Sequence, residues 1–251
     1  MMRIGLVKHF NARPLTYGFE EDKSKYDLYY DNPSILKDML LRGELDTALI
    51  SSVECWRNRD TLGFSKTTGV CASERVRSIL FYHNRKESYP PEKVYVDSGS
   101  RTSVALLKVL LQLSVGKIPE MISQDPSYIF SMLNRAEGYH MLFGDNALLA
   151  RFSLYHYYSY DLATWWNKET GKSFCFAFWA FPLDKPIPDA FFEESLERGL
   201  DNIRKIIRHD TRLPREVLYK YLSSDLHYYV REEDYEGFEL FSEYCREYDI
   251  L

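Results

Sequence analysis

The sequence predicts an α/β protein made of two lobes, and two observations carry this prediction. Segments with strand periodicity alternate with helical segments from the first residues onward, a pattern typical of sheets flanked by helices. Two proline-bearing breaks, 90–91 and 186–188, bracket an α/β segment in the middle of the chain. The chain therefore leaves one lobe and returns to it. We expect residues 1–86 plus 184–251 to form lobe 1 and residues 87–183 to form lobe 2, each on a mostly parallel sheet.

The N-terminal elements follow from local signals. Residues 3–7 have the composition of a buried strand, and a second short strand is expected near 26–30. Asn32, followed by proline, marks the start of a helix, and Gly43 marks its end. Residues 46–50 predict the next strand.

The middle of the chain repeats this alternation, and the C-terminal part is predicted to be helical from about residue 192 onward. Residues 174–181 form a fully apolar segment that predicts a buried strand. The remaining expected strands and helices lie at 77–82, 93–96, 101–113, 140–143 and 144–151.

Composition excludes several classes of protein. The 251-residue chain has a formal net charge of −5 and no block of basic residues, which argues against nucleic-acid binding. The longest apolar run, 174–181, is far shorter than the ~20 residues that cross a bilayer. We therefore expect neither nucleic acid nor membrane as a partner.

The cysteines and the N-terminal segment indicate a cytoplasmic protein. No apolar secretory segment opens the chain, and no Cys-x-x-Cys motif occurs. The four cysteines are widely spaced and are expected to be reduced packing residues, with no metal site: Cys55, Cys71, Cys175 and Cys245.

Three expected helix starts could hold an anion, because free N–H groups and the helix dipole favour negative charge there. They lie at Ser51 and Ser52, at 97–103, and at 144–146. The middle one is the richest, since Gly99 permits close backbone approach and Arg101 offers a planar fork that matches a carboxylate. Ordinary helix capping by its hydroxyl residues is the alternative reading.

Signatures of nucleotide binding, serine hydrolysis and zinc hydrolysis do not occur in the sequence. His9 follows the first expected strand, at the edge of the sheet where α/β proteins bind ligands, although an ordinary surface or core role is the better-supported interpretation. Glu54 is expected to serve the first turn of its helix rather than to act as a base.

Five ordered motifs resemble the chorismate dehydratase family of the futalosine route to menaquinone, over nearly the whole chain. The most specific is Asp-Ser-Gly-Ser-Arg-Thr-Ser at 97–103. The resemblance implies a two-lobed α/β fold like the type II periplasmic binding proteins, with the ligand in the interlobe cleft. The other motifs are Asn-Ala-Arg-Pro-Leu at 11–15, Ile-Ser-Ser-Val-Glu at 50–54, Gly-Asp-Asn-Ala-Leu at 144–148, and Thr170-Gly171 before 174–179.

The family removes water from chorismate to give 3-[(1-carboxyvinyl)oxy]benzoate, a carbon–oxygen lyase (hydro-lyase) reaction that needs no metal or organic cofactor. The resemblance implies that Asn11 and Ser78 are catalytic and that the substrate is a small dicarboxylate. The proton acceptor stays open among Glu54, Asp145 and a substrate carboxylate. The residues implied in substrate binding are Ser51, Ser52, Ser100, Arg101, Thr102, Ser103, Gly144 and Asp145.

The sequence departs from the family where Glu74-Arg75-Val76 replaces a usual Gly-Pro-Val, where Lys8-His9-Phe10 precedes Asn11, and at Ser173, where proline is typical. These changes keep two alternatives open. One is a non-catalytic two-lobed binding protein for a small carboxylate. The other is the sister 1,4-dihydroxy-6-naphthoate synthase, whose N-terminal segment typically reads Ser-Pro-Cys-Pro-Asn-Asp.

Overall fold

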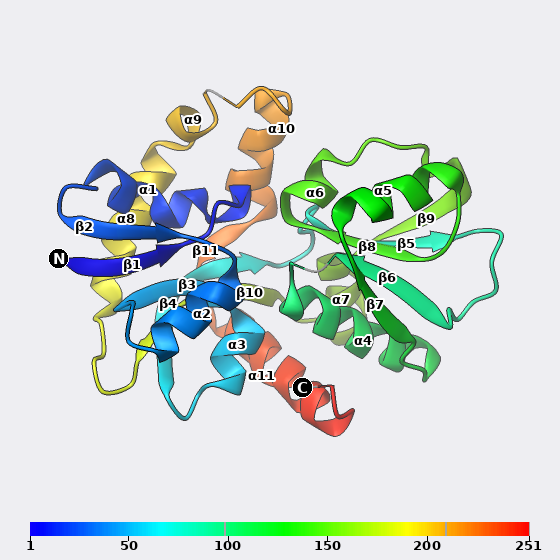
Figure 1. Ribbon diagram of the computed structural model, residues 1–251, viewed down its shortest axis with the longest axis horizontal. Helices are drawn as coiled ribbons and strands as arrows, with labels where there is room; N and C mark the ends of the chain where they lie inside the picture. The colour runs from blue at the N-terminus through cyan, green and yellow to red at the C-terminus, as the bar shows by residue number, and fades with distance from the viewer. Residues whose placement is uncertain (98, 209, 251) are drawn as a thin grey trace.

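A computed structural model describes residues 1–97, 99–208 and 210–250, and Figure 1 shows the arrangement of its strands and helices. The strands are β1 (Met2–Leu6), β2 (Tyr26–Tyr30), β3 (Thr47–Ser51), β4 (Leu62–Ala72), β5 (Ile79–Asn84), β6 (Lys93–Asp97), β7 (Glu120–Gln124), β8 (His140–Phe143), β9 (Tyr157–Asp161), β10 (Phe174–Pro182) and β11 (His227–Tyr229).

The helices are α1 (Arg13–Glu21), α2 (Pro33–Leu41), α3 (Ser52–Arg57), α4 (Arg101–Val115), α5 (Pro126–Arg135), α6 (Gly144–Leu149), α7 (Leu162–Thr170), α8 (Asp189–Asp201), α9 (Ile203–Ile206), α10 (Arg215–Lys220) and α11 (Glu232–Glu247). A π-helical turn, Tyr221–Asp225, follows α10 directly. Short 3-10 turns lie at Phe10–Ala12 and Leu154–His156. Within the described ranges, no helix has the length and apolarity needed to span a bilayer.

Two separate sheets define two lobes. The first lobe contains a six-stranded sheet of order β11-β4-β10-β3-β1-β2, and the second contains a five-stranded sheet of order β7-β6-β8-β5-β9. The prediction of mostly parallel sheets is wrong. β10 is antiparallel to both β3 and β4, and β5 is antiparallel to both β8 and β9. A strand that re-enters a sheet from another lobe is not bound by the right-handed crossover that makes neighbouring strands parallel.

The chain passes between the lobes one strand earlier than the expected boundaries at each crossover. The expectation placed residues 79–84 in the first lobe and 174–182 in the second. Instead, β5 pairs within the five-stranded sheet and β10 pairs within the six-stranded sheet. The crossings therefore lie between β4 and β5 and between α7 and β10, ahead of both proline-bearing breaks. Proline marks turns well, but which sheet a strand joins is decided by long-range pairing.

Side chains that alternate along β10 form the core on both faces of the first sheet. Trp179 stacks on Phe192 of α8 at 5.2 Å between ring centroids, on the face covered by α1 and α8. Its neighbour Phe178 points to the other face and packs on Phe238 of α11 at 5.3 Å. This two-sided burial explains why the strand is apolar throughout rather than alternating.

The two lobes share apolar packing as well as chain crossings. Trp166 of α7, in the second lobe, is fully buried and makes edge contacts with Phe174 of β10 and Phe241 of α11. One continuous hydrophobic core thus extends from the first lobe into the second. Figure 1 shows α11 passing beneath both lobes, next to α4.

Candidate active site

A pocket with a volume of about 180 Å³ lies between the lobes, which leaves room for a small organic molecule. It is formed where strands end and helices begin. From the first lobe the lining residues are Val7, His9, Asn11, Ala12, Pro33, Ser34, Leu49, Ile50, Ser51, Glu54, Val70, Phe176 and Ala177. From the crossing and the second lobe they are Ser78, Ile79, Gly99, Ser100, Arg101, Thr102, Ser103, Phe143 and Gly144.

Asn11 brings an unengaged amide to the pocket. It lies in the 3-10 turn between β1 and α1, and Pro14 near the start of α1 fixes the backbone that follows. In the described part of the chain, no hydrogen bond involves the Asn11 side chain. Its amide N–H groups and carbonyl oxygen are therefore available to a ligand.

The start of α4 presents hydroxyl groups, but most of them already have partners. Ser100 caps the helix by accepting a hydrogen bond from the Ser103 N–H at 3.1 Å, and its own hydroxyl donates to the Ser103 hydroxyl at 2.7 Å. Thr102 accepts a hydrogen bond from the Val53 N–H of α3, which joins the two lobes. Capping and lobe contact thus account for much of this motif. Ser98, also part of it, lies outside the described residues.

Arg101 forms an ion pair across the pocket with Glu54. Its Nη1 atom is 2.8 Å from Oε1 of Glu54, whose side chain is only 3% exposed. Two further cations surround the same carboxylate, Arg57 at 3.7 Å and Lys37 at 3.9 Å. Lys37 also pairs with Asp38, so three cations face two carboxylates and the cluster around Glu54 is positive overall. Of the three cations, Arg101 is the one that lines the pocket, where its charge suits an anionic ligand. Glu54 lies in the first turn of α3, as the sequence predicts.

Ser78 reaches the pocket from the second lobe, immediately before β5, whereas the sequence placed it on a strand of the first lobe. Its side chain is buried and accepts a hydrogen bond from the Tyr221 hydroxyl at 2.8 Å. It also donates to the Val76 carbonyl at 3.2 Å. Asn11 and Ser78 therefore line the same pocket from opposite lobes.

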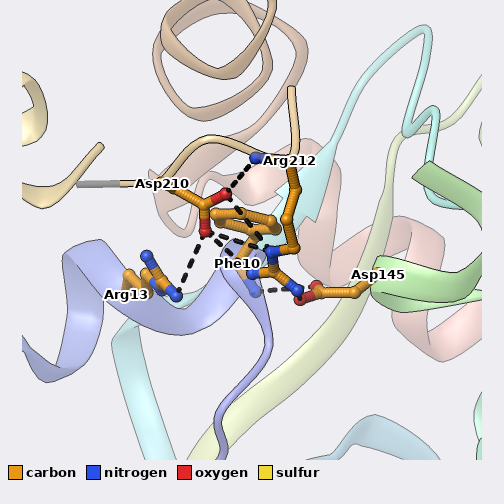
Figure 2. A network of polar contacts seen from close by, with 5 residues as sticks. All are labelled: Phe10, Arg13, Asp145, Asp210 and Arg212. Atoms are coloured by element: carbon orange, nitrogen blue, oxygen red, sulfur yellow. Dashed lines mark hydrogen bonds and ion pairs between the residues drawn. The ribbon is translucent and has the colours of Figure 1, made fainter. Parts of the chain in front are cut away.

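Asp145 and Ser52, both predicted to bind substrate, are not among the residues that line the pocket. Asp145 instead joins the lobes, as Figure 2 shows. One carboxylate oxygen accepts a hydrogen bond from the Phe10 N–H at 3.0 Å, and the other accepts from Arg212 at 3.2 Å. Ser52 is fully buried, and its hydroxyl has no partner among the described residues.

Asp210 extends this lobe-joining network in Figure 2. Its carboxylate pairs with Arg212 at 2.9 Å and with Arg13 of α1 at 3.8 Å. The Arg212 guanidinium also lies over the Phe10 ring, 4.4 Å from its centroid. Arg212 therefore connects the segment before α10 with the start of α6 in the second lobe.

His9 is a neutral imidazole in the pocket. Burial lowers its pKa, and the nearby carboxylates of Asp145 and Asp97 offset only part of this effect. Its ring contacts Phe143 edge to face at 5.4 Å. A histidine that is neutral at neutral pH can accept a proton, so His9 is able to act as a base as well as to pack.

One cluster in the described residues has the composition of a metal site, but none of its three residues lines the pocket. Cys71, His227 and Asp234 place one donor atom each within 4.8 Å of one another. Both oxygens of Asp234 are already engaged, by the Ser173 hydroxyl, the Arg231 N–H and the His227 ring. Because the carboxylate is fully satisfied without an ion, the cluster is explained as a buried hydrogen-bond network.

Sequence reasoning missed several pocket residues. Pro33 and Ser34 start α2 after β2, so the helix-start argument that found the other three sites applies to them equally. Phe143 and Phe176 supply apolar side chains to the pocket. Both lie on apolar strands that the sequence predicts to be buried, so nothing indicated that they face a pocket. Tyr221 is distant in sequence from Ser78 and carries no local signal of the contact.

Solved structures share this architecture. Protein AF1704 from Archaeoglobus fulgidus superposes with a TM-score of 0.77 at 14% identity, covering 100% of this chain and 98% of that one. The periplasmic aliphatic sulphonate binding protein SsuA from Escherichia coli gives a TM-score of 0.60 at 15% identity, over 100% of this chain and 88% of that one. The predicted fold is confirmed: this is a two-lobed α/β protein of the periplasmic-binding-protein type, with a pocket between its lobes that polar and apolar residues line.

Sequence comparison is more specific. The chain is 27% identical to the chorismate dehydratase of Thermus thermophilus, over 96% of this chain and 93% of that protein. A family described as menaquinone biosynthesis matches residues 2–247. The protein belongs to this menaquinone biosynthesis family, as its motifs predict.

Proposed function

We propose that the protein is a chorismate dehydratase, a hydro-lyase that converts chorismate to 3-[(1-carboxyvinyl)oxy]benzoate in menaquinone biosynthesis. The observation that carries the proposal is that Asn11 and Ser78 line one interlobe pocket from different lobes, together with the cationic side chain of Arg101. Family membership and the similarity to a chorismate dehydratase over 96% of the chain support it.

The reaction removes the ring hydroxyl and one ring hydrogen of chorismate as water, which leaves an aromatic ring. Aromatisation supplies the driving force, so the protein has to hold the substrate and assist two proton movements. Asn11, with a free amide, donates a hydrogen bond to the departing hydroxyl. Ser78, on the other lobe, donates to charge that develops on the same ring.

A substrate carboxylate binds at Arg101. Arg101 is the most exposed of the three cations around Glu54, and its guanidinium keeps donors free beyond its contact with that carboxylate. Hydroxyl groups at the start of α4 add neutral donors. We therefore propose that the substrate is held as a dicarboxylate, in spite of the net charge of −5.

The ring proton needs an acceptor in the pocket. Asp145 does not line the pocket and is held by Phe10 and Arg212, which leaves Glu54, His9 and a substrate carboxylate. The variants Glu54→Gln and His9→Asn separate these three: loss of turnover with unchanged affinity for chorismate in one variant identifies that residue, and activity in both assigns the role to the substrate.

Incubation of the purified protein with chorismate, followed by mass spectrometry of the aromatic product, tests the function. Asn11→Ala and Ser78→Ala should each lower kcat by ~10²-fold, since each removes a donor to developing charge. Asn134→Ala and Ser131→Ala, on the exposed surface of α5, are matched controls that should keep full activity. Binding of chorismate without turnover would overturn the enzyme proposal in favour of a binding protein.

A further inference from the structure

The Ser78 hydroxyl is held by a single side chain from the other lobe. The Tyr221 hydroxyl donates to the Ser78 oxygen at 2.8 Å, and both side chains are almost completely buried. Burial raises the pKa of Tyr221 well above its ordinary value, so the phenol stays protonated and remains a donor at every working pH. Because Tyr221 donates, the hydrogen of Ser78 must point elsewhere, to the Val76 carbonyl or to a ligand.

The backbone on either side of Ser78 is also fixed. Arg77 has a φ of +55°, a left-handed conformation that is costly for a side chain of this size. The half-buried carboxylate of Asp161 accepts hydrogen bonds from the N–H groups of Val76 and Arg77, at 3.1 and 2.6 Å. The Ser78 carbonyl in turn accepts from the Gly144 N–H at 2.6 Å. Strain that is held in place this firmly is typical of functional positions.

The same π-helical turn that supplies Tyr221 also holds Arg77. Asp225, the last residue of the turn Tyr221–Asp225, forms an ion pair with the Arg77 guanidinium. One turn of the first lobe therefore binds two consecutive residues of the second lobe: Asp225 pairs with the charge of Arg77, and Tyr221 donates a hydrogen bond to Ser78. π-helical turns are rare and are found frequently at functional sites.

We propose that Tyr221 is a positioning residue, which orients and polarises the Ser78 hydroxyl so that its hydrogen points into the pocket when substrate binds. This deepens the proposed dehydratase function and rests on it. Donation from the phenol to the serine oxygen makes the serine a stronger donor, because hydrogen bonds in a chain polarise one another. Tyr221 itself does not line the pocket, so it acts through Ser78.

The test is a double-mutant cycle with Tyr221→Phe, Ser78→Ala and the double variant. Tyr221→Phe should lower kcat by about 10-fold, because the loss of one hydrogen bond raises the activation barrier, and KM should stay within twofold of the parent. In the Ser78→Ala background the same change should have no further effect on kcat, which a general loss of packing would not produce.

Tyr228→Phe is the matched control, because the Tyr228 side chain is buried and its hydroxyl has no partner among the described residues. It should keep the kcat of the parent. A kcat for Tyr221→Phe equal to that of the parent, or an equal loss in both backgrounds, would overturn the positioning role and leave the dehydratase function intact.

Failure of the function itself gives a different result. If the parent protein does not convert chorismate, the dehydratase proposal is wrong. Calorimetric titration of chorismate into the four proteins of the cycle then measures how strongly Tyr221 and Ser78 are coupled in ligand binding. Coupled losses of affinity would then support positioning of Ser78 toward a bound ligand. Additive losses, or no binding by any of the four, would overturn it.

Discussion

Glu54 and Arg101 form an ion pair that joins α3 of the first lobe to α4 of the second, with 2.8 Å between oxygen and nitrogen. The carboxylate side is 3% exposed and the guanidinium side 53% exposed. The pair therefore has one end fixed in the protein and one end open to the pocket. A ligand carboxylate can bind the open side of Arg101 while Glu54 holds the other side in place.

Arg101→Ala should weaken chorismate binding by about 1.5–3 kcal/mol, the range for a hydrogen bond to a charged group. Arg57 and Lys37 remain beside Glu54 in the variant, so the buried carboxylate keeps cationic neighbours and the fold should persist. Calorimetric titration measures the affinity. Arg135→Ala at the exposed end of α5 is the control, and an unchanged affinity in Arg101→Ala would place the anion site elsewhere.

Arg212→Ala should loosen the contact between the lobes. The ion pair with Asp145 is partly exposed, with side chains 44% and 20% accessible, so its loss should cost at most about 1 kcal/mol of chorismate affinity. Because salt screens such pairs, the difference from the parent should shrink at 1 M NaCl, where the Debye length is ~3 Å. An affinity difference that is unaffected by salt would contradict an electrostatic contact.

Gly199→Ala should destabilise the first lobe, because α8 packs against α1 at this point. A Cβ at Gly199 would lie 1.9 Å from the Pro14 carbonyl oxygen, a backbone atom that cannot move away cheaply. We expect a loss of about 3 kcal/mol in the free energy of unfolding, at the upper end for overpacking. Urea denaturation measures it. Gly43→Asn is the control, since Gly43 has open space around it and asparagine tolerates its φ of +71°.

Stability should fall as the pH is lowered from 7.5 to 6. Burial lowers the pKa of both His9 and His140, so below the unfolded value of about 6.5 the unfolded chain binds more protons than the folded one. Below that pH, each histidine lowers the free energy of unfolding by up to about 1.4 kcal/mol per pH unit. Well above it, neither histidine changes the stability. Asp97 and Asp161, whose pKa values burial raises, act in the opposite sense at lower pH, so the measurement stays above pH 6.

Urea denaturation across this range should show a shallower pH dependence in His9→Phe than in the parent. An aromatic replacement keeps the edge contact with Phe143 and removes the titrating group. A pH dependence that is identical in the two proteins would mean that His9 titrates normally in the folded state.

Local signals predicted many of the elements, but they missed α1, α5, β7 and β9, and the C-terminal part that was expected to be helical contains the strand β11. They predicted the pairing of the strands poorly. Asn32 with the following proline starts α2, and Gly171 in a left-handed conformation ends α7, because caps and stops depend on neighbouring residues only. β4 was not predicted, since Gly63, Gly69 and a lysine between them interrupt its apolar pattern. The strand at 174–182 was recognised, but its partners in the first lobe are far away in sequence.

The candidate site shows the same division. Helix starts gave Ser51, Arg101 and Ser103 at the pocket, because anion-binding geometry is a local property of a helix N-terminus. Asp145 also lies at a helix start, but its carboxylate accepts hydrogen bonds from Phe10 and Arg212 instead of lining the pocket. Tyr221 lies 143 residues from Ser78, so only the folded chain could bring the two hydroxyls together.

The place where the chain leaves and re-enters the six-stranded sheet has a topological consequence. Ala72 at the end of β4 and Phe174 at the start of β10 are paired residues on antiparallel neighbours. In a simple sheet, such strands would be joined by a two-residue turn. The whole second lobe is thus an insertion at the tip of a β-hairpin, and a short Asn-Gly turn in its place has the length to join β4 to β10 without changing the strand order of the first sheet.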